Sequence, residues 1–225
     1  MKRLGHRGTP RTHRENTLEG FQNALICGLD GIELDTQPTR DGQMVVFHDE
    51  HLPDGRLLAS LTWQEIQQEF PFVPLLSDVL GWAKDHPGFL INVELKNDSN
   101  VSDGREKHLM EVLKKYGMHE QMVISSFNPI SLVRLYALDS SYRLGFLYDG
   151  EHGLEWLATV GLHLPLYSLH PHHTQVTEDL LSAARNNKKQ VFTWTVNDLA
   201  LMQKFKAWGL DAVIGDVPEV LLGEG

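Results

Sequence analysis

The sequence predicts an α/β protein built as a closed (β/α)8 barrel, the TIM-barrel architecture, with a short, reduced insertion after the second strand. Eight segments typical of buried strands lie near residues 3, 33, 92, 124, 145, 167, 193 and 213, and most precede a segment with helical periodicity. Eight strand–helix units within 225 residues favour a closed barrel over an open doubly wound sheet. Because the chain shows no internal repeat, low-complexity run or linker, residues 1–225 are expected to form a single domain.

Residue patterns predict where the strands and helices lie along the chain. The strands are expected at residues 2–5, 31–37, 89–95, 122–126, 143–147, 164–169, 190–196 and 211–214. The helices are expected at residues 18–25, 63–69, 75–84, 105–116, from 129 onwards, around 154–160, 178–186 and 199–207. In the first helix, Leu18, Phe21 and Ala24 recur at helical spacing. We expect Asn16, which precedes this helix, to be its N-cap.

The second strand departs from the simple alternation of strand and helix. A turn at residues 40–42 returns the chain into an extended run at 44–47, which predicts a hairpin-like excursion. Residues 50–74 are polar and irregular apart from the helix at 63–69, with prolines at 71 and 74. A short insertion is therefore expected between the second and third strands of the barrel.

Composition excludes several classes of function. The chain has 30 acidic against 20 basic residues, and its formal net charge of -10 would repel a nucleic-acid backbone, although a small phosphate ester could still bind. With Cys27 as the only cysteine, neither a disulfide framework nor a thiolate metal site is expected. No apolar run is long enough for a signal peptide or a membrane span, so we expect a cytoplasmic protein without stable membrane insertion. The sequence does not specify an oligomeric state.

Two strands carry charged residues on one face. In the segment GIELD, Glu33 and Asp35 share a face because side chains alternate along a strand, and in NVELK the same holds for Glu94 and Lys96. In a parallel sheet covered by helices, that face has no bulk water. Buried carboxylates without partners cost several kcal/mol, so a bound cation is the simplest compensation.

Further polar residues stand at the carboxyl ends of the expected strands, where the catalytic groups of such barrels lie. His6 and Arg7 end the first strand, and His48 ends the return run. Three carboxylates predict a hard-cation site for Mg²⁺, Ca²⁺ or Mn²⁺, whereas two histidines suit general acid and base catalysis. Arg7 and Lys96 could bind a phosphate group. This combination is the one that phosphodiester hydrolysis needs.

The motifs HRG, ENT, GIELDTQPTRDG, VVFHD, VELK and WTVN occur in this order between Leu4 and Pro218. Together they resemble the glycerophosphodiester phosphodiesterase family over nearly the whole chain. The resemblance implies a TIM barrel that hydrolyses glycerophosphodiesters to an alcohol and sn-glycerol 3-phosphate with one divalent cation, Mg²⁺ or Ca²⁺ with Mn²⁺ as a further option. The nucleophile would be water or the glycerol hydroxyl of the substrate, and the latter would form a cyclic phosphate.

The same resemblance implies a role for each matching residue. The general acid and base would be His6 and His48, and the metal ligands would be Glu33, Asp35 and Glu94. Substrate contacts would come from Arg7, Lys96, Phe127 and Trp194, the last as an aromatic wall beside the glycerol moiety. Neither the choice of acid and base among the histidines nor the identity of the metal follows from these motifs.

The chain departs from the family pattern in two places. The segment after His48 is shorter than usual, which leaves the alcohol preference open, and Gly215 stands where the family has a Thr before Asp-x-Pro. Two rival functions remain: a lysophospholipase D that acts on lipid substrates, and a non-catalytic barrel that binds a phosphate metabolite. The paired histidines argue against the second rival, because a binding module needs no acid–base pair.

Simpler interpretations of the same residues also remain. Glu33 and Asp35 could lie on the solvated face of an antiparallel strand, and Glu94 with Lys96 could form a structural ion pair. Trp194 could be a core residue. The histidines at positions 163, 170, 172 and 173 are expected to be loop residues near the barrel mouth, because Pro165 and Pro171 suggest loop geometry. They are not expected to be metal ligands, because none has a companion at helical spacing with a nearby carboxylate.

Overall fold

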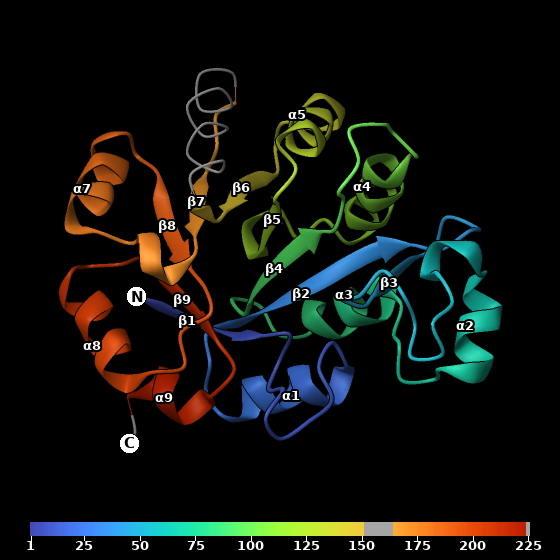
Figure 1. The fold of residues 1–225 in the computed structure, drawn as a ribbon, viewed down its shortest axis with the longest axis horizontal. Helices are drawn as coiled ribbons and strands as arrows, with labels where there is room; N and C mark the ends of the chain where they lie inside the picture. Colours follow the sequence, from blue (N-terminus) through green and yellow to red (C-terminus); the bar gives the residue numbers. More distant parts are fainter. Residues whose placement is uncertain (151–163, 224–225) are drawn as a thin grey trace.

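The computed structural model describes residues 1–150 and 164–223. Eight parallel strands close a ring in which β1 pairs with both β2 and β9, and β3 adds to β2 in antiparallel orientation outside the ring (Figure 1). The strands are β1 (Lys2–His6), β2 (Gly31–Pro38), β3 (Met44–Val46), β4 (Leu90–Leu95), β5 (Met122–Ser126), β6 (Arg143–Tyr148), β7 (Ser168–Pro171), β8 (Gln190–Thr193) and β9 (Ala212–Gly215). The predicted (β/α)8 barrel is confirmed.

Helices surround this ring. They are α1 (Leu18–Ile26), α2 (Trp63–Glu69), α3 (Leu76–Lys84), α4 (Arg105–Tyr116), α5 (Pro129–Leu138), α7 (Glu178–Asn186), α8 (Leu199–Ala207) and α9 (Pro218–Leu222). Short 3-10 helices occur at Leu58–Ser60, His119–Gln121 and His173–Gln175. The helix expected around residues 154–160 lies outside the described residues, and α9 has no counterpart in the elements expected from sequence.

Apolar residues fill two regions of the barrel. One extended cluster lies between the outer faces of the strands and the helices, and includes Phe21, Ile32 and Val93. A smaller cluster gathers Leu4, Val123, Phe192, Ala212 and Ile214, the last of which also lines the site cavity described below. Burial of apolar surface at about 25 cal/mol per Å² is the main source of stability in such a core. The polar residues of the site are thereby set on a rigid, well-packed support.

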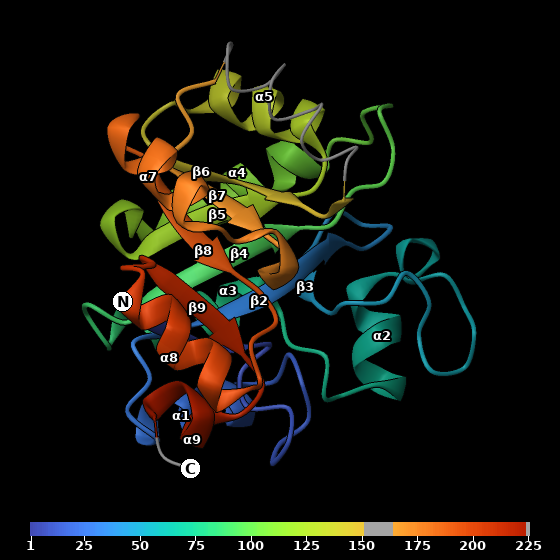
Figure 2. The same ribbon diagram turned by 60° about the vertical axis from the view of Figure 1, so that its left-hand side comes forward.

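The insertion between β3 and α3 has a small core of its own. Val45, Leu58 and Ile66 are fully buried in it, and partly buried aromatic side chains pack against them. Thr62 caps α2 in a capping box with Glu65, which explains where this predicted helix begins. In Figure 2 the insertion with α2 stands beside the barrel, on the side towards which the β2 and β3 arrows point.

Two strands, β7 and β8, have boundaries that differ by more than one residue from those expected. The seventh strand of the ring, β7, begins at Ser168 and not at residue 164, because Pro165 lacks the N–H that a sheet ladder requires. Regular pairing of β8 ends at Thr193, although the N–H of Val196 still donates to the carbonyl of Ile214 at 2.9 Å. Trp194 therefore comes immediately after β8.

The interpretation of His170 as a loop residue is wrong. His170 lies in β7 and is fully buried, with its ring stacked on Phe192 at 4.8 Å between centroids. Its Nε2 lies 2.8 Å from the hydroxyl of Ser168, and burial lowers the pKa of His170 to about 3. Gly145 on β6 leaves room for this ring, because a Cβ there would lie 2.5 Å from Nε2. His163 lies outside the described residues.

Candidate active site

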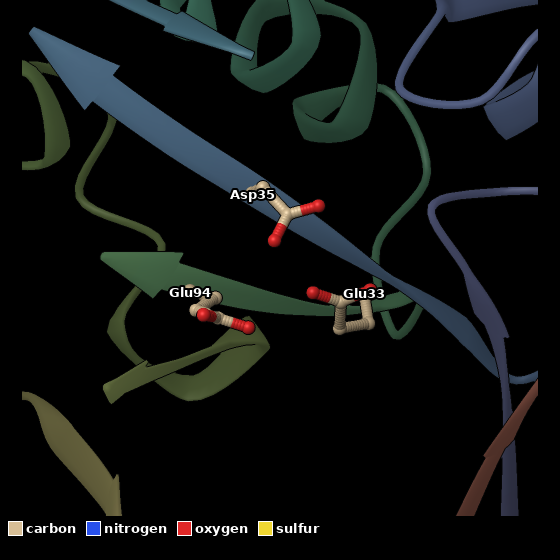
Figure 3. A group of neighbouring side chains, drawn as sticks. All are labelled: Glu33, Asp35 and Glu94. Carbon is tan, nitrogen blue, oxygen red and sulfur yellow. The ribbon is translucent and has the colours of Figure 1, made fainter. Parts of the chain in front are cut away.

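Three carboxylates from β2 and from the carboxyl end of β4 converge inside the barrel. Glu33 and Asp35 project from β2 and Glu94 from β4, and Figure 3 shows the three side chains turned towards a common point. One ligand oxygen of each lies within 4.8 Å of those of the other two. Sheet register explains this proximity, because Asp35 is paired with Glu94 on the neighbouring strand. All three are buried.

The buried carboxylates repel one another. Burial, together with the neighbouring Asp35 and Glu94, raises the pKa of Glu33 well above its ordinary value. Burial and the charge of Asp35 likewise raise the pKa of Glu94 to about 7. A cation among the three oxygens would relieve this repulsion, and oxygen ligands at this spacing are suited to a divalent metal. The donor set therefore fits the predicted metal site.

Two cations flank the cluster. Lys96 Nζ lies 3.0 Å from Glu94 and 3.7 Å from Asp35, and Arg7 Nε lies 3.2 Å from Asp35. The N–H of Arg7 also donates to Glu33 at 3.1 Å, from a backbone with φ of 53°. Burial would lower the pKa of Arg7 and Lys96, but the adjacent carboxylates outweigh this effect and raise both. When all three carboxylates are ionised, they outnumber the two cations.

Asn16 holds one of the carboxylates in place. Its Nδ2 donates to Asp35 Oδ2 at 2.9 Å, and its Oδ1 accepts from the N–H of Asp35 at 3.3 Å. The expectation that Asn16 caps α1 is wrong, because Thr17 is the N-cap and accepts from the N–H of Gly20. Asn16 has a φ of 56°, a left-handed conformation that Asn tolerates better than most residues. The residue belongs to the site and not to the helix.

Each histidine is held by a carboxylate through its Nδ1. His6 Nδ1 lies 2.7 Å from Asp216 Oδ1, and Asn197 Nδ2 donates to the other Asp216 oxygen at 2.6 Å. Burial would raise the pKa of Asp216, but the hydrogen bonds from His6 and Asn197 outweigh it and lower this pKa. His48 Nδ1 lies 2.7 Å from Asp49 Oδ1. Since a carboxylate only accepts, Nδ1 carries the proton in both rings and Nε2 is left for chemistry.

A cavity of about 180 Å³ joins these groups. It is lined by His6, Arg7, Glu33, His48, Asn92, Glu94, Lys96, Phe127, Leu147, Trp194 and Ile214. Phe127 and Trp194 meet edge to face at 5.4 Å and form its aromatic side. The indole N–H of Trp194 donates to the carbonyl of His170 at 2.9 Å, which fixes the ring. A larger cavity of about 860 Å³ lies at the opposite end of the barrel, beside Lys2 and Asp211.

The chain is similar to known proteins over nearly its whole length. Residues 6–220 match the model of the glycerophosphoryl diester phosphodiesterase family. The chain belongs to this family. A glycerophosphodiester phosphodiesterase of Caldanaerobacter subterraneus subsp. tengcongensis is 32% identical over 97% of this chain and 95% of its own. The predicted family resemblance is thus confirmed.

Two further similar proteins carry names that point to different activities. A phosphodiesterase of Oleispira antarctica, solved with the product sn-glycerol-3-phosphate, has a TM-score of 0.86 at 26% identity and covers 99% of this chain and 95% of its own. A human lysophospholipase D is 26% identical over 90% of this chain and 71% of its own. Within residues 1–150 and 164–223, no helix combines the length and apolar character needed to cross a bilayer.

The structure brings the predicted site residues of this family member together. Eight of the nine line the cavity of about 180 Å³, and the ninth, Asp35, lies in the carboxylate cluster. Asp216 and Asn16 were missed, although both had a signal. Asp216 follows β9 directly, two residues after Ile214, so it shares the interior face and the carboxyl-end position used to find the others. Asn16 belongs to the ENT motif, but its expected role as a helix N-cap already explained why an Asn stands there.

Proposed function

We propose that this protein is a single TIM-barrel catalytic domain that hydrolyses glycerophosphodiesters to an alcohol and sn-glycerol 3-phosphate with one divalent cation and two histidines. Membership of the family makes it a phosphodiesterase for glycerophosphodiesters. The observation that carries the mechanism is the cluster of Glu33, Asp35 and Glu94 directly beside two carboxylate-held histidines.

The metal would be held by those three carboxylates. When bound there, a divalent cation supplies positive charge against a phosphate oxygen and lowers the pKa of a nucleophilic hydroxyl. Mg²⁺, Ca²⁺ and Mn²⁺ all accept such oxygen ligands. Arg7 and Lys96 complete the electrostatic setting, because both line the cavity and can donate to phosphate oxygens as charge increases in the transition state.

Proton transfer is assigned to His6 and His48. Both line the cavity, and each presents Nε2 because Nδ1 is engaged by Asp216 or Asp49. One histidine takes the proton of the attacking hydroxyl, and the other protonates the oxygen of the leaving alcohol as its bond to phosphorus breaks. The glycerol moiety is proposed to lie against Phe127 and Trp194, whose aromatic faces exclude water from that side.

The test is release of sn-glycerol 3-phosphate from glycerophosphocholine by wild type, His6→Ala and His48→Ala. Loss of a general acid or base lowers the rate by about 10²- to 10⁴-fold. His108→Ala is the matched control, because His108 lies on α4 and is absent from the lining of the cavity. Near-wild-type rates in both site variants would overturn the assignment.

Leaving groups of different pKa separate the two histidine roles. The variant that lacks the general acid should be rescued by a leaving alcohol of low pKa, whereas the variant that lacks the base should not. Identical responses of both variants would contradict separate roles. Turnover of lysophosphatidylcholine but not of glycerophosphocholine would favour the lysophospholipase D rival, and tight binding of glycerophosphocholine without turnover would favour the non-catalytic one.

A further inference from the structure

An asparagine lies at the floor of the site cavity, below the carboxylate cluster. Asn92 opens the NVELK motif, and the alternation of side chains along β4 puts it on the interior face with Glu94. Because β4 runs towards the end of the barrel that holds the site, Asn92 lies about 6–7 Å deeper than Glu94. Leu90, two residues earlier on the same face, lines the cavity at the opposite end of the barrel. Asn92 is therefore the deepest residue of β4 that lines the site cavity.

One end of the Asn92 amide is fixed by the neighbouring strand. Its Nδ2 donates to the hydroxyl oxygen of Ser125 on β5 at 3.2 Å, and both residues are fully buried. On the other side, sheet register sets Asn92 beside the metal ligand Glu33 of β2. The orientation of this amide is therefore set by the barrel itself and does not depend on a loop.

The other end of the amide, Oδ1, is a buried acceptor that receives no hydrogen bond from any of the described residues. Such groups are rare in folded proteins, because a buried acceptor without a donor is unfavourable. The cations that line the same cavity, Arg7 and Lys96, are already paired with carboxylates. Leu147 and Ile214, which also line it, have no side-chain donor to offer. A hydroxyl of a bound ligand is the donor that would complete this site.

We infer that Asn92 is a specificity-determining residue, whose Oδ1 accepts a hydrogen bond from the terminal hydroxyl of the glycerol group. This inference rests on the proposed function. The phosphate is placed at Arg7 and Lys96, nearer the mouth of the barrel, so the hydroxyl farthest from phosphorus is the one that reaches the floor. An acyl ester at that oxygen has no proton to donate, and its chain would collide with the packed interior around Ile214.

The test compares kcat/KM of the metal-loaded wild type for glycerophosphocholine and for the analogue in which propane-1,2-diol of matching configuration replaces glycerol. The analogue lacks the terminal hydroxyl but keeps the secondary one, so a nucleophilic role of the secondary hydroxyl is not disturbed. The wild type should cleave the analogue about 5- to 150-fold less efficiently, the effect of leaving one buried acceptor without its partner. This comparison needs no variant to fold.

Two variants assign the preference to the amide. Asn92→Leu, a change to an apolar side chain of similar size, should cleave glycerophosphocholine and the analogue with nearly equal kcat/KM. Ser125→Ala keeps Oδ1 but releases the amide, so it should reduce the preference only in part. Calorimetry of the products gives a readout without turnover: wild type should bind sn-glycerol 3-phosphate more tightly than propane-1,2-diol 1-phosphate, whereas Asn92→Leu should bind the two alike.

Asn186→Leu is the matched control, because Asn186 is exposed at the end of α7 and does not line the site cavity. A wild type that cleaves both esters equally, or a preference that survives in Asn92→Leu, would overturn the role of Asn92 and leave the proposed function standing. A wild type that releases no sn-glycerol 3-phosphate from glycerophosphocholine would overturn the proposed function and this inference together.

Discussion

The contribution of Glu94 to the stability of the metal-free protein should fall as the pH rises. Its pKa in the fold is about 7 against an ordinary value of 4.5. Between these two pH values the folded chain holds a proton that the unfolded chain has lost, so raising the pH favours unfolding. The difference corresponds to about 3 kcal/mol, which is fully lost above pH 7. A divalent cation added at pH 8 should restore stability, because it compensates the ionised carboxylate.

Urea unfolding of EDTA-treated protein at pH 5 and pH 8 measures this effect, with Glu94→Gln as the comparison. The amide cannot ionise, so the variant should lose about 2.5 kcal/mol less than wild type over this interval and gain little from added cation. Glu111→Gln, an exposed change on α4, should behave as wild type does. Equal pH dependence in wild type and Glu94→Gln would refute the reasoning.

Three further predictions concern the groups that support the site. Asp216→Asn should lower kcat by about 10- to 100-fold with little change in KM, because His6 loses its orienting carboxylate, and an unchanged kcat would argue against that role. Asn16→Ala should weaken divalent-cation affinity by about 10- to 100-fold in calorimetry through loss of its bond to Asp35, whereas equal affinity would leave Asn16 without a role in the metal site. His170 has a pKa of about 3 in the fold against 6.5 ordinarily, so the unfolded chain takes up the proton first as the pH falls. Relative to His170→Gln, wild type should therefore lose about 2 kcal/mol of stability between pH 7 and pH 5, and equal acid sensitivity of the two in urea unfolding would contradict this.

Residue patterns predicted the barrel because its strands and helices alternate with strong periodicity. The alternation of side chains along β2 and β4 was enough to place Glu33, Asp35 and Glu94 on one interior face. The register of the two strands brings their ligand oxygens within 4.8 Å of one another. Trp194 likewise lies at the carboxyl end of β8, as its position late in a strand indicated. Local periodicity, together with the rule that catalytic groups lie at the carboxyl ends of barrel strands, therefore predicted most of the site residues.

Residues whose roles depend on distant contacts were harder to predict. Asn16 is a residue type that often caps helices. Its left-handed backbone and its contact with Asp35, 19 positions away, show instead that it holds Asp35 in place. Asp216 contacts His6 from 210 positions away, so its place after β9 indicates the carboxyl end of the barrel but does not identify His6 as its partner. His170 was assigned to a loop because Pro165 and Pro171 flank it, yet the strand includes Pro171. For Asn16 and His170, a local rule was overridden by tertiary packing.

The most direct test of the central claim is metal-dependent release of sn-glycerol 3-phosphate. Protein stripped with EDTA would be assayed on glycerophosphocholine with Mg²⁺, Mn²⁺ or Ca²⁺ added back, alongside Glu33→Ala. The structure predicts no release without metal, recovery with at least one of the three ions, and loss of that recovery in the variant. Release that persists in EDTA, or full activity of Glu33→Ala, would contradict a catalytic metal at this carboxylate cluster.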